Sequence, residues 1–272
     1  MPAIMSTNKT HPLASIAHAH ASAPSLSLPA ILGDQLFTLY SQAQKSDYVF
    51  GSPLGPFYHA GRPHYLPRFV YFGPHTSDES PRMAFLAGLD SRDLRPTLAM
   101  LRLVEELALK PDLGQSLHLA FFPLVDVLGQ QRQAGHRDLA GQSWAAPSAP
   151  EIGLLADDSR LRHYHAFIRI ESVAADDVVT LRLRSVDGAV AGLPLISSED
   201  TEPFAVRWEI DTGSRSGTGP LTLGDDLPFR PIELTLQVPT DWPPELYREA
   251  VVVILKRFIL RYREFLAYGQ HL

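Results

Sequence analysis

The chain of 272 residues contains no cysteine. Disulfide bonds and thiolate metal sites are therefore excluded, although the redox compartment stays undetermined. The chain also lacks a long basic cluster: 24 Lys and Arg stand against 30 Asp and Glu, which gives a formal net charge of −6. Because nucleic-acid binding relies on a basic surface that neutralises phosphates, this balance disfavours a nucleic-acid partner.

Long apolar runs are missing as well. No run approaches the ~20 residues that a membrane-spanning helix needs, and the late apolar stretch Val251–Leu255 ends at Lys256. No Gly-x-Ser-x-Gly elbow, phosphate loop or dinucleotide fingerprint is present, so a serine hydrolase or a nucleotide enzyme has no positive support. We expect a soluble, cytoplasmic protein without a membrane partner.

What the chain does have is ordinary globular composition, with 45% hydrophobic and 20% charged residues. Residues 1–29 are rich in Ala, Ser, His and Pro and lack the apolar core of a secretory signal, so we expect a disordered tail there. In residues 30–272 strand and helix patterns alternate. This alternation predicts a single α/β domain whose mixed, mostly parallel sheet has helices on both faces.

The stretch Arg82–Lys110 organises this domain. Met83–Leu89 is an almost unbroken apolar run, which predicts a strand covered on both faces. A polar bend follows, and Pro96 suits the first turn of the next helix. In open α/β sheets ligands collect at the loop that follows such a strand. This loop offers Asp90 and Asp93, three residues apart.

Other elements follow from apolar spacing and from Gly and Pro signals. The expected strands are Tyr48–Phe50, Arg68–Phe72, Leu117–Phe122, Ala166–Val173, Val178–Arg184, Phe204–Ile210 and Ile232–Val238, and the expected helices are Gly33–Ala43, Pro150–Arg162 and Asp241 to about Tyr268. Turns are expected at Gly51–Pro53 and Gly61–Pro63. Pro123–Trp144 fits neither a simple helix nor a simple strand. A loop this long in a compact domain is usually functional.

Short segments follow one another in a fixed order along these elements. The central strand ends in Ala-Gly-Leu-Asp-Ser-Arg-Asp, at Ala87–Asp93. Next come a proline (Pro123), an Asp-Val-Leu-Gly turn (Asp126–Gly129) and an arginine (Arg132). An Asp-Leu-Ala-Gly segment (Asp138–Gly141), a Pro-Glu helix start (Pro150–Glu151) and an Ile-Glu pair late in a strand (Ile170–Glu171) follow.

This order resembles that of the zinc metallocarboxypeptidases, especially the bacterial branch related to succinylglutamate desuccinylase and aspartoacylase. In that family the strand ends in a Gly-hydrophobic-His-Gly-(Asp/Asn)-Glu loop. An Asn-Pro-Asp-Gly-like turn, an arginine, an Asp-Leu-Asn-Arg segment and a strand ending in Leu-His come later. The resemblance covers roughly Gly33 to Tyr268 and implies the zinc-carboxypeptidase fold.

The resemblance also assigns roles to positions. Family zinc is held by two His and one Glu, and a late Glu removes a proton from the zinc-bound water. The ligand positions here are Asp90, Asp93 and Glu171, and the base position is Gln237. The carboxylate clamp, Asn-Arg in the family, is Ala-Gly here at positions 140 and 141. Arg132 therefore remains as the candidate anion contact, and His136 lies in the facing loop as a second substrate-binding candidate.

The three acids allow two interpretations. Converging carboxylates would repel one another unless a hard cation such as Ca²⁺, Mg²⁺ or Mn²⁺ lay between them. Alternatively Asp90 and Asp93 are polar loop and helix-entry residues, and Glu171 is paired with a nearby arginine, for which Arg92, Arg95 and Arg169 are available. His163 and His165 give a further option, because in an extended chain both would point to one side, as metal ligands could.

These observations lead to three function hypotheses. In the first, zinc ligands and base are lost, and a pseudoenzyme without zinc binds a small acidic or peptide-like ligand, or a protein partner. In the alternative, an active metal-dependent hydrolase of the carboxypeptidase or N-acyl amino-acid deacylase type uses a site rebuilt from the acids or from His136, His163 and His165. The third hypothesis is a scaffold with an occluded cleft.

Overall fold

A computed structural model describes residues 30–131, 137, 139–174, 177–185, 201–211, 219–227 and 231–269. The predicted tail at residues 1–29, together with Arg132 and His136, lies outside the described residues. Within them, no helix has the length and apolar character that crossing a membrane requires.

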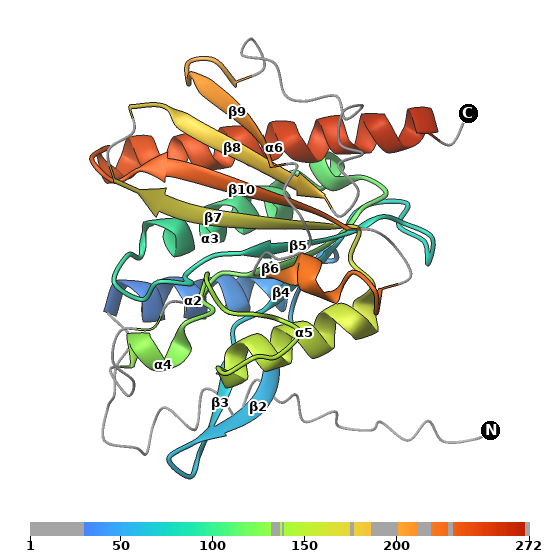
Figure 1. The fold of residues 1–272 in the computed structure, drawn as a ribbon. Helices are drawn as coiled ribbons and strands as arrows, with labels where there is room; N and C mark the ends of the chain where they lie inside the picture. The colour runs from blue at the N-terminus through green and yellow to red at the C-terminus, as the bar shows by residue number, and fades with distance from the viewer. Residues whose placement is uncertain are drawn as a thin grey trace, which may run out of the picture.

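One eight-stranded sheet forms the centre of the protein, as Figure 1 shows. In sheet order its strands are β1 (Val49–Gly51), β4 (Phe69–Phe72), β6 (His118–Phe122), β5 (Arg82–Leu86), β7 (Ala166–Val173), β10 (Ile232–Pro239), β8 (Val179–Ser185) and β9 (Val206–Asp211). β6, β5, β7 and β10 run parallel, as do β8 and β9. The pairs β1–β4, β4–β6 and β10–β8 are antiparallel. The prediction of a mixed, mostly parallel sheet is confirmed.

Helices cover both faces of this sheet (Figure 1). Their bounds are α2 (Ala30–Ala43), α3 (Arg95–Leu109), α4 (Val127–Gln130), α5 (Pro150–Arg162) and α6 (Pro244–Gly269). Tyr40 of α2 packs on Phe69 with ring centroids 4.5 Å apart, whereas Arg68 pairs with Asp158 of α5 at 2.6 Å. Because neighbouring residues of an extended chain point to opposite faces, α2 and α5 lie on opposite sides of the sheet.

The centre of the core is the strand pair β5–β6. Every residue of β6 is buried, and so are Met83 to Leu86 of β5. The helix α3 turns Met100, Leu103, Val104 and Leu107 toward this core. The apolar run therefore is a buried central strand, as predicted, and the helix after it begins at Arg95.

Besides small shifts in element bounds, the structure differs from the sequence predictions at the central strand and after the first predicted turn. The central strand ends at Leu86 rather than Leu89, because Gly88 has a φ of +61° and turns the chain out of the sheet. Between the two predicted turns the chain forms a hairpin, β2 (Leu54–His59) with β3 (Arg62–Leu66). One of its faces is buried through Phe57, His64 and Leu66. Two one-turn 3-10 helices, η1 (Pro111–Gly114) and η4 (Pro220–Leu223), complete the described elements.

Candidate functional site

The turn after β5 is pressed against the segment after β6. A Cβ on Gly88 would lie 2.9 Å from the carbonyl oxygen of Pro123 and 3.0 Å from the Cα of Leu124. Two hydrogen bonds join the same segments, from the Val125 N–H to the Ala87 carbonyl (3.1 Å) and from the Asp126 N–H to the Gly88 carbonyl (2.8 Å). Glycine at position 88 therefore fixes the point at which the chain that carries Asp90 and Asp93 leaves the sheet.

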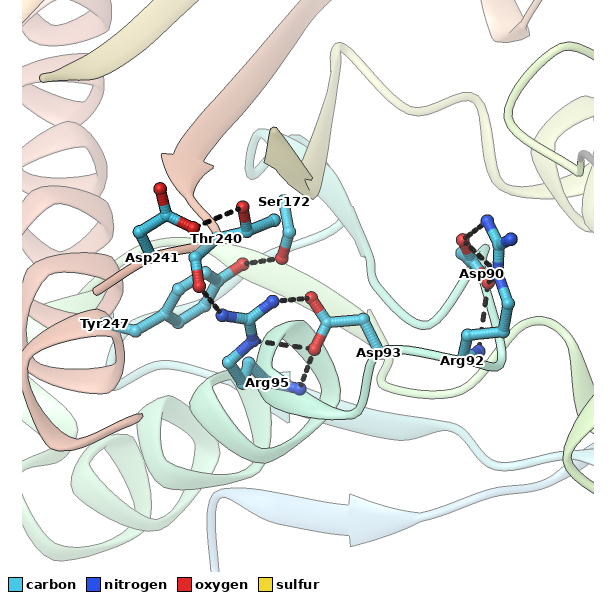
Figure 2. Close-up of polar contacts among 8 residues, drawn as sticks. All are labelled: Asp90, Arg92, Asp93, Arg95, Ser172, Thr240, Asp241 and Tyr247. Atoms are coloured by element: carbon cyan, nitrogen blue, oxygen red, sulfur yellow. Dashed lines mark hydrogen bonds and ion pairs between the residues drawn. The ribbon is translucent and has the colours of Figure 1, made fainter. Parts of the chain in front are cut away.

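The four positions that the resemblance assigned to metal and base lie at one edge of the sheet. β5, β7 and β10 are parallel, so their carboxyl ends meet there. Glu171 and Gln237 are direct partners across β7 and β10. Yet Figure 2 shows Asp90 turned toward Arg92 and away from Asp93. Among the residues that the structure describes, no group of three or more His, Cys, Asp or Glu could hold a metal ion.

Asp90 forms an exposed pair within its own loop. Its carboxylate accepts hydrogen bonds from the backbone N–H (2.9 Å), Nε (3.0 Å) and Nη2 (2.6 Å) of Arg92. The side chains of Asp90 and Arg92 are 44% and 67% exposed. An ion pair in this much water contributes little to stability.

Asp93 forms the corresponding pair with Arg95 in a more enclosed place. It accepts from the backbone N–H (3.0 Å), Nε (2.8 Å) and Nη2 (2.8 Å) of Arg95, and the two side chains are 21% and 25% exposed. Burial alone would raise the pKa of Asp93, but hydrogen bonds from Arg95 and Ser172 overcome it and hold the pKa below its usual value. Asp93 is therefore held as a charged, hydrogen-bonded carboxylate.

Arg95 also reaches beyond its own loop (Figure 2). Its Nη1 donates to the carbonyl oxygen of Thr240, just after β10, and its Cζ lies 5.3 Å from the ring centroid of Tyr247 in α6. Ser172 of β7 donates to the Tyr247 hydroxyl at 3.0 Å. Burial raises the pKa of that tyrosine, so it stays protonated at neutral pH. This network joins three distant parts of the chain.

Glu171 contacts a third arginine, Arg169, with 3.7 Å between Nη1 and Oε1. Arg169 also donates from Nη1 to the Ala140 carbonyl at 3.2 Å, in the segment that the resemblance assigned to the carboxylate clamp. Its Nε lies 2.7 Å from the buried carboxylate of Glu233, which Arg184 contacts from the other side. The Arg169–Glu233 contact is close but poorly directed for a hydrogen bond.

The structure thus pairs each of the three acids with the arginine two residues away. The second interpretation expected such a partner for Glu171, but it did not predict the pairs that Asp90 and Asp93 form. Sequence reasoning did not find the Arg169–Glu233–Arg184 cluster. A signal for it was available: Arg182 and Arg184 alternate with apolar residues on β8, as Glu233 does on β10. Residues two apart on one strand share a face, and their direct partners on the neighbouring strand lie on the same face.

A second buried cluster was also missed. Arg137 lies between two fully buried acids, Asp126 and Glu151, and its Nη2 is 2.7 Å from Glu151 Oε1. Asp126 also caps α4 by accepting from the Gly129 N–H at 3.0 Å. The sequence places these acids in a turn and at a helix start, but their spacing does not reveal that they share one arginine.

The histidine alternative is contradicted for two of its three members. His163 is not extended: its φ is +54°, and its N–H donates to the Ser159 carbonyl as the last turn of α5 closes. His165 comes directly before β7, and its Nδ1 accepts from the Arg82 N–H at 3.1 Å. Glu171 is six residues further along this strand, about 20 Å away at the usual strand rise. Both histidines therefore lie at the opposite edge of the sheet.

As a zinc donor set, the described residues at this edge fit poorly. Asp90, Asp93 and Glu171 provide only oxygen, whereas zinc sites usually include imidazole or thiolate. Each of these carboxylates already contacts a guanidinium. Gln237, opposite Glu171, carries an amide that has no proton-accepting function near neutral pH.

Comparison with known proteins rests on solved structures. No family model and no curated protein sequence matches the chain. A metallo-carboxypeptidase of Burkholderia cenocepacia superposes with a TM-score of 0.58 at 14% identity, over 84% of this chain and 68% of that one. The fold is that of the metallocarboxypeptidases.

Two further structures agree with this. The metallo-carboxypeptidase of Pseudomonas aeruginosa, in complex with (2-guanidinoethylmercapto)succinic acid, has a TM-score of 0.59 at 14% identity over 84% of this chain and 68% of that one. An aspartoacylase family protein of Mesorhizobium loti has a TM-score of 0.51 at 13% identity over 77% and 67%. The predicted resemblance is thus confirmed in the metallocarboxypeptidase fold, which by itself does not establish an activity.

Proposed function

We propose that this protein is a non-catalytic binding protein built on the metallocarboxypeptidase fold, and that a small acidic or peptide-like ligand binds at the carboxyl edge of β5, β7 and β10. One observation carries the proposal. Asp93, at a family ligand position, directs its carboxylate to Arg95 instead of toward Asp90, while Glu171 faces Gln237 where the family has its base.

The chemistry of metal-assisted hydrolysis supports the absence of catalysis. A zinc-bound water needs three protein ligands that leave a fourth position open, and a base that takes its proton. Loss of the general base alone typically costs ~10²–10⁴ in rate. Here the base position carries an amide, and the ligand positions carry acids bound to arginines. No single surviving residue compensates for the loss of both elements.

Guanidinium groups at the same edge support an acidic ligand. Arg169 contacts Glu171 and the Ala140 carbonyl, and arginine is well suited to bind carboxylates through paired hydrogen bonds. The Pseudomonas aeruginosa structure contains a succinic acid derivative. Arg132 and His136 are the predicted ligand contacts, and a protein partner presenting an acidic segment or a free C-terminus would be recognised by the same chemistry.

Calorimetric titration with (2-guanidinoethylmercapto)succinic acid and with C-terminal dipeptides tests this proposal. We expect saturable binding without hydrolysis, weakened by Arg132→Gln and unaffected by Arg92→Gln, whose side chain is exposed and engaged with Asp90. Elemental analysis of protein purified without chelators or an affinity-tag metal gives the second readout. Stoichiometric zinc together with turnover that Asp90→Ala abolishes would contradict the proposal.

The alternative, an active hydrolase with a rebuilt metal site, has lost part of its support. His163 and His165 lie at the far edge of the sheet, so the alternative now depends on His136 and the three acids. A hard divalent cation at these acids would need to displace Arg95 from Asp93. Mn²⁺-dependent hydrolysis that Asp93→Asn abolishes would favour this alternative over the non-catalytic proposal.

A further inference from the structure

Two Asp-x-Arg pairs stand in the same loop and have the same local geometry. In both, the carboxylate accepts from the backbone N–H and the guanidinium of the arginine two residues later. Asp90–Arg92 is exposed, whereas Asp93–Arg95 is mostly enclosed. A local loop preference explains the shared geometry but not the difference in burial.

The enclosed pair connects elements that are far apart in sequence. Arg95 donates to Thr240 after β10 and lies over Tyr247 of α6, while Ser172 of β7 helps to lower the pKa of Asp93. The hydrogen bond between Ser172 and Tyr247 connects β7 to α6. Figure 2 shows these side chains gathered on one side of the loop. Arg95 therefore contributes both its charge and its planar shape to these contacts.

We propose that the guanidinium of Arg95 is the built-in cation of this edge. It neutralises Asp93 and ties the β5–α3 turn to β10 and α6, so that the edge is held together without a metal ion. This inference does not depend on whether the edge binds a ligand, because it concerns the charge balance and connectivity of the free protein.

Arginine has the properties that this role requires. Its charge is permanent, and its five N–H donors are fixed in one plane. Asp93 takes two of these donors, Thr240 takes a third, and the flat face lies against Tyr247. A lysine would retain the charge but not this set of contacts. A divalent cation approaching Asp93 would meet a positive charge that is already in place.

A double-mutant cycle tests the inference, with melting temperature as the readout. Arg95→Met leaves a partly enclosed carboxylate without its cation, and we expect a loss of about 4 °C or more. Asp93→Asn should also lower the melting temperature, and the double variant should lose clearly less than the sum, because the two residues interact. The matched cycle of Asp90→Asn and Arg92→Met should change the melting temperature by less than about 1 °C.

Two further measurements keep the inference testable if Arg95→Met does not fold. Arg95→Lys should melt between wild type and Arg95→Met, about 2 °C below wild type. Added zinc should leave the melting temperature of wild type unchanged. The inference is overturned if Arg95→Met or Arg95→Lys melts like wild type, if the effects at 93 and 95 are additive, or if zinc stabilises wild type and Asp93→Asn removes that effect.

Discussion

Glu171 and Gln237 lie directly opposite each other on the parallel strands β7 and β10. The resemblance assigns these positions to a zinc ligand and to the catalytic base, so the two assigned positions are neighbours on adjacent strands. Here one position holds a carboxylate and the other an amide. The functional groups at these two positions therefore differ from those that the resemblance implies.

This pairing predicts how activity could be rebuilt. We expect no measurable carboxypeptidase or N-acyl amino-acid hydrolase turnover from the wild type, even with zinc added. Asp90→His, Asp93→Glu and Glu171→His together should create zinc affinity, measured by competition with a chromogenic chelator. Turnover should remain low until Gln237→Glu supplies a group that can accept the water's proton. Hydrolysis by wild type that Asp90→Ala abolishes would refute this account.

Gly88 provides a test of the loop geometry. Gly88→Ala places a Cβ 2.9 Å from the Pro123 carbonyl oxygen, which is closer than Cβ atoms normally come to backbone. It also requires a positive φ that alanine disfavours. We expect a loss of about 3 kcal/mol or more in the free energy of unfolding. Gly61→Ala is the matched control, since its φ is +75° but nothing lies within 4 Å of the added Cβ. It should cost about 1 kcal/mol. Equal losses in denaturant titrations would show that close packing at Gly88 is unimportant.

His118 predicts a dependence of stability on pH. Burial, followed by repulsion from Arg162, Arg82 and Arg68, lowers its pKa to about 4. The unfolded chain, with a pKa near 6.5, binds this proton more readily, so stability is fully present above pH 6.5 and falls as the pH drops toward 4. The loss attributable to this residue is about 2–3 kcal/mol.

His118→Gln should flatten the stability profile between pH 4 and 6.5, as measured by urea titrations at each pH. An NMR titration of the imidazole provides the direct check. If His118 in the folded protein gains its proton near pH 6.5, the predicted burial effect is absent.

Arg68 and Asp158 form a buried pair that fastens α5 to the sheet. Arg68 Nη1 lies 2.6 Å from Asp158 Oδ1, and the Tyr164 hydroxyl donates to the other carboxylate oxygen at 2.7 Å. Arg68→Met removes the closer of two cations from this buried carboxylate and leaves only Arg162, whose Nε lies 3.8 Å from Oδ1. We therefore expect a loss of about 3 kcal/mol in calorimetric or denaturant unfolding. Tyr164→Phe removes one hydrogen bond to a charged group and should cost about 2 kcal/mol. A larger loss of stability for Tyr164→Phe than for Arg68→Met would contradict the assigned roles.

The sequence was most informative where one physical signal dominates. The apolar run at Met83–Leu86 could only be a covered strand, and Pro96 and the leucine spacing marked the helix after it. The end of that strand was misplaced, because an apolar run does not reveal that Gly88 adopts a positive φ. The β2–β3 hairpin was missed since its prolines and glycines resemble turn signals.

The sequence predicted which strand ends meet at this edge, but not the contacts of the side chains there. The order of motifs placed Asp90, Asp93, Glu171 and Gln237 at the carboxyl edge of the predicted sheet. The arginine partner of each acid is local, but Arg95 also depends on Thr240 and Asp93 on Ser172, which are far away in sequence. The histidine pair failed for a local reason, because His163 closes the end of α5 and does not continue the strand.

The place of β10 in the sheet has a consequence for synthesis of the protein. β10 begins at residue 232, yet it lies between β7 and β8, which precede it in the chain. Until β10 has left the ribosome, these two strands have no partner on their facing edges. Unpaired edges of apolar strands promote association with other chains. We therefore expect the growing chain to depend on chaperones until β10 has emerged and paired with both strands.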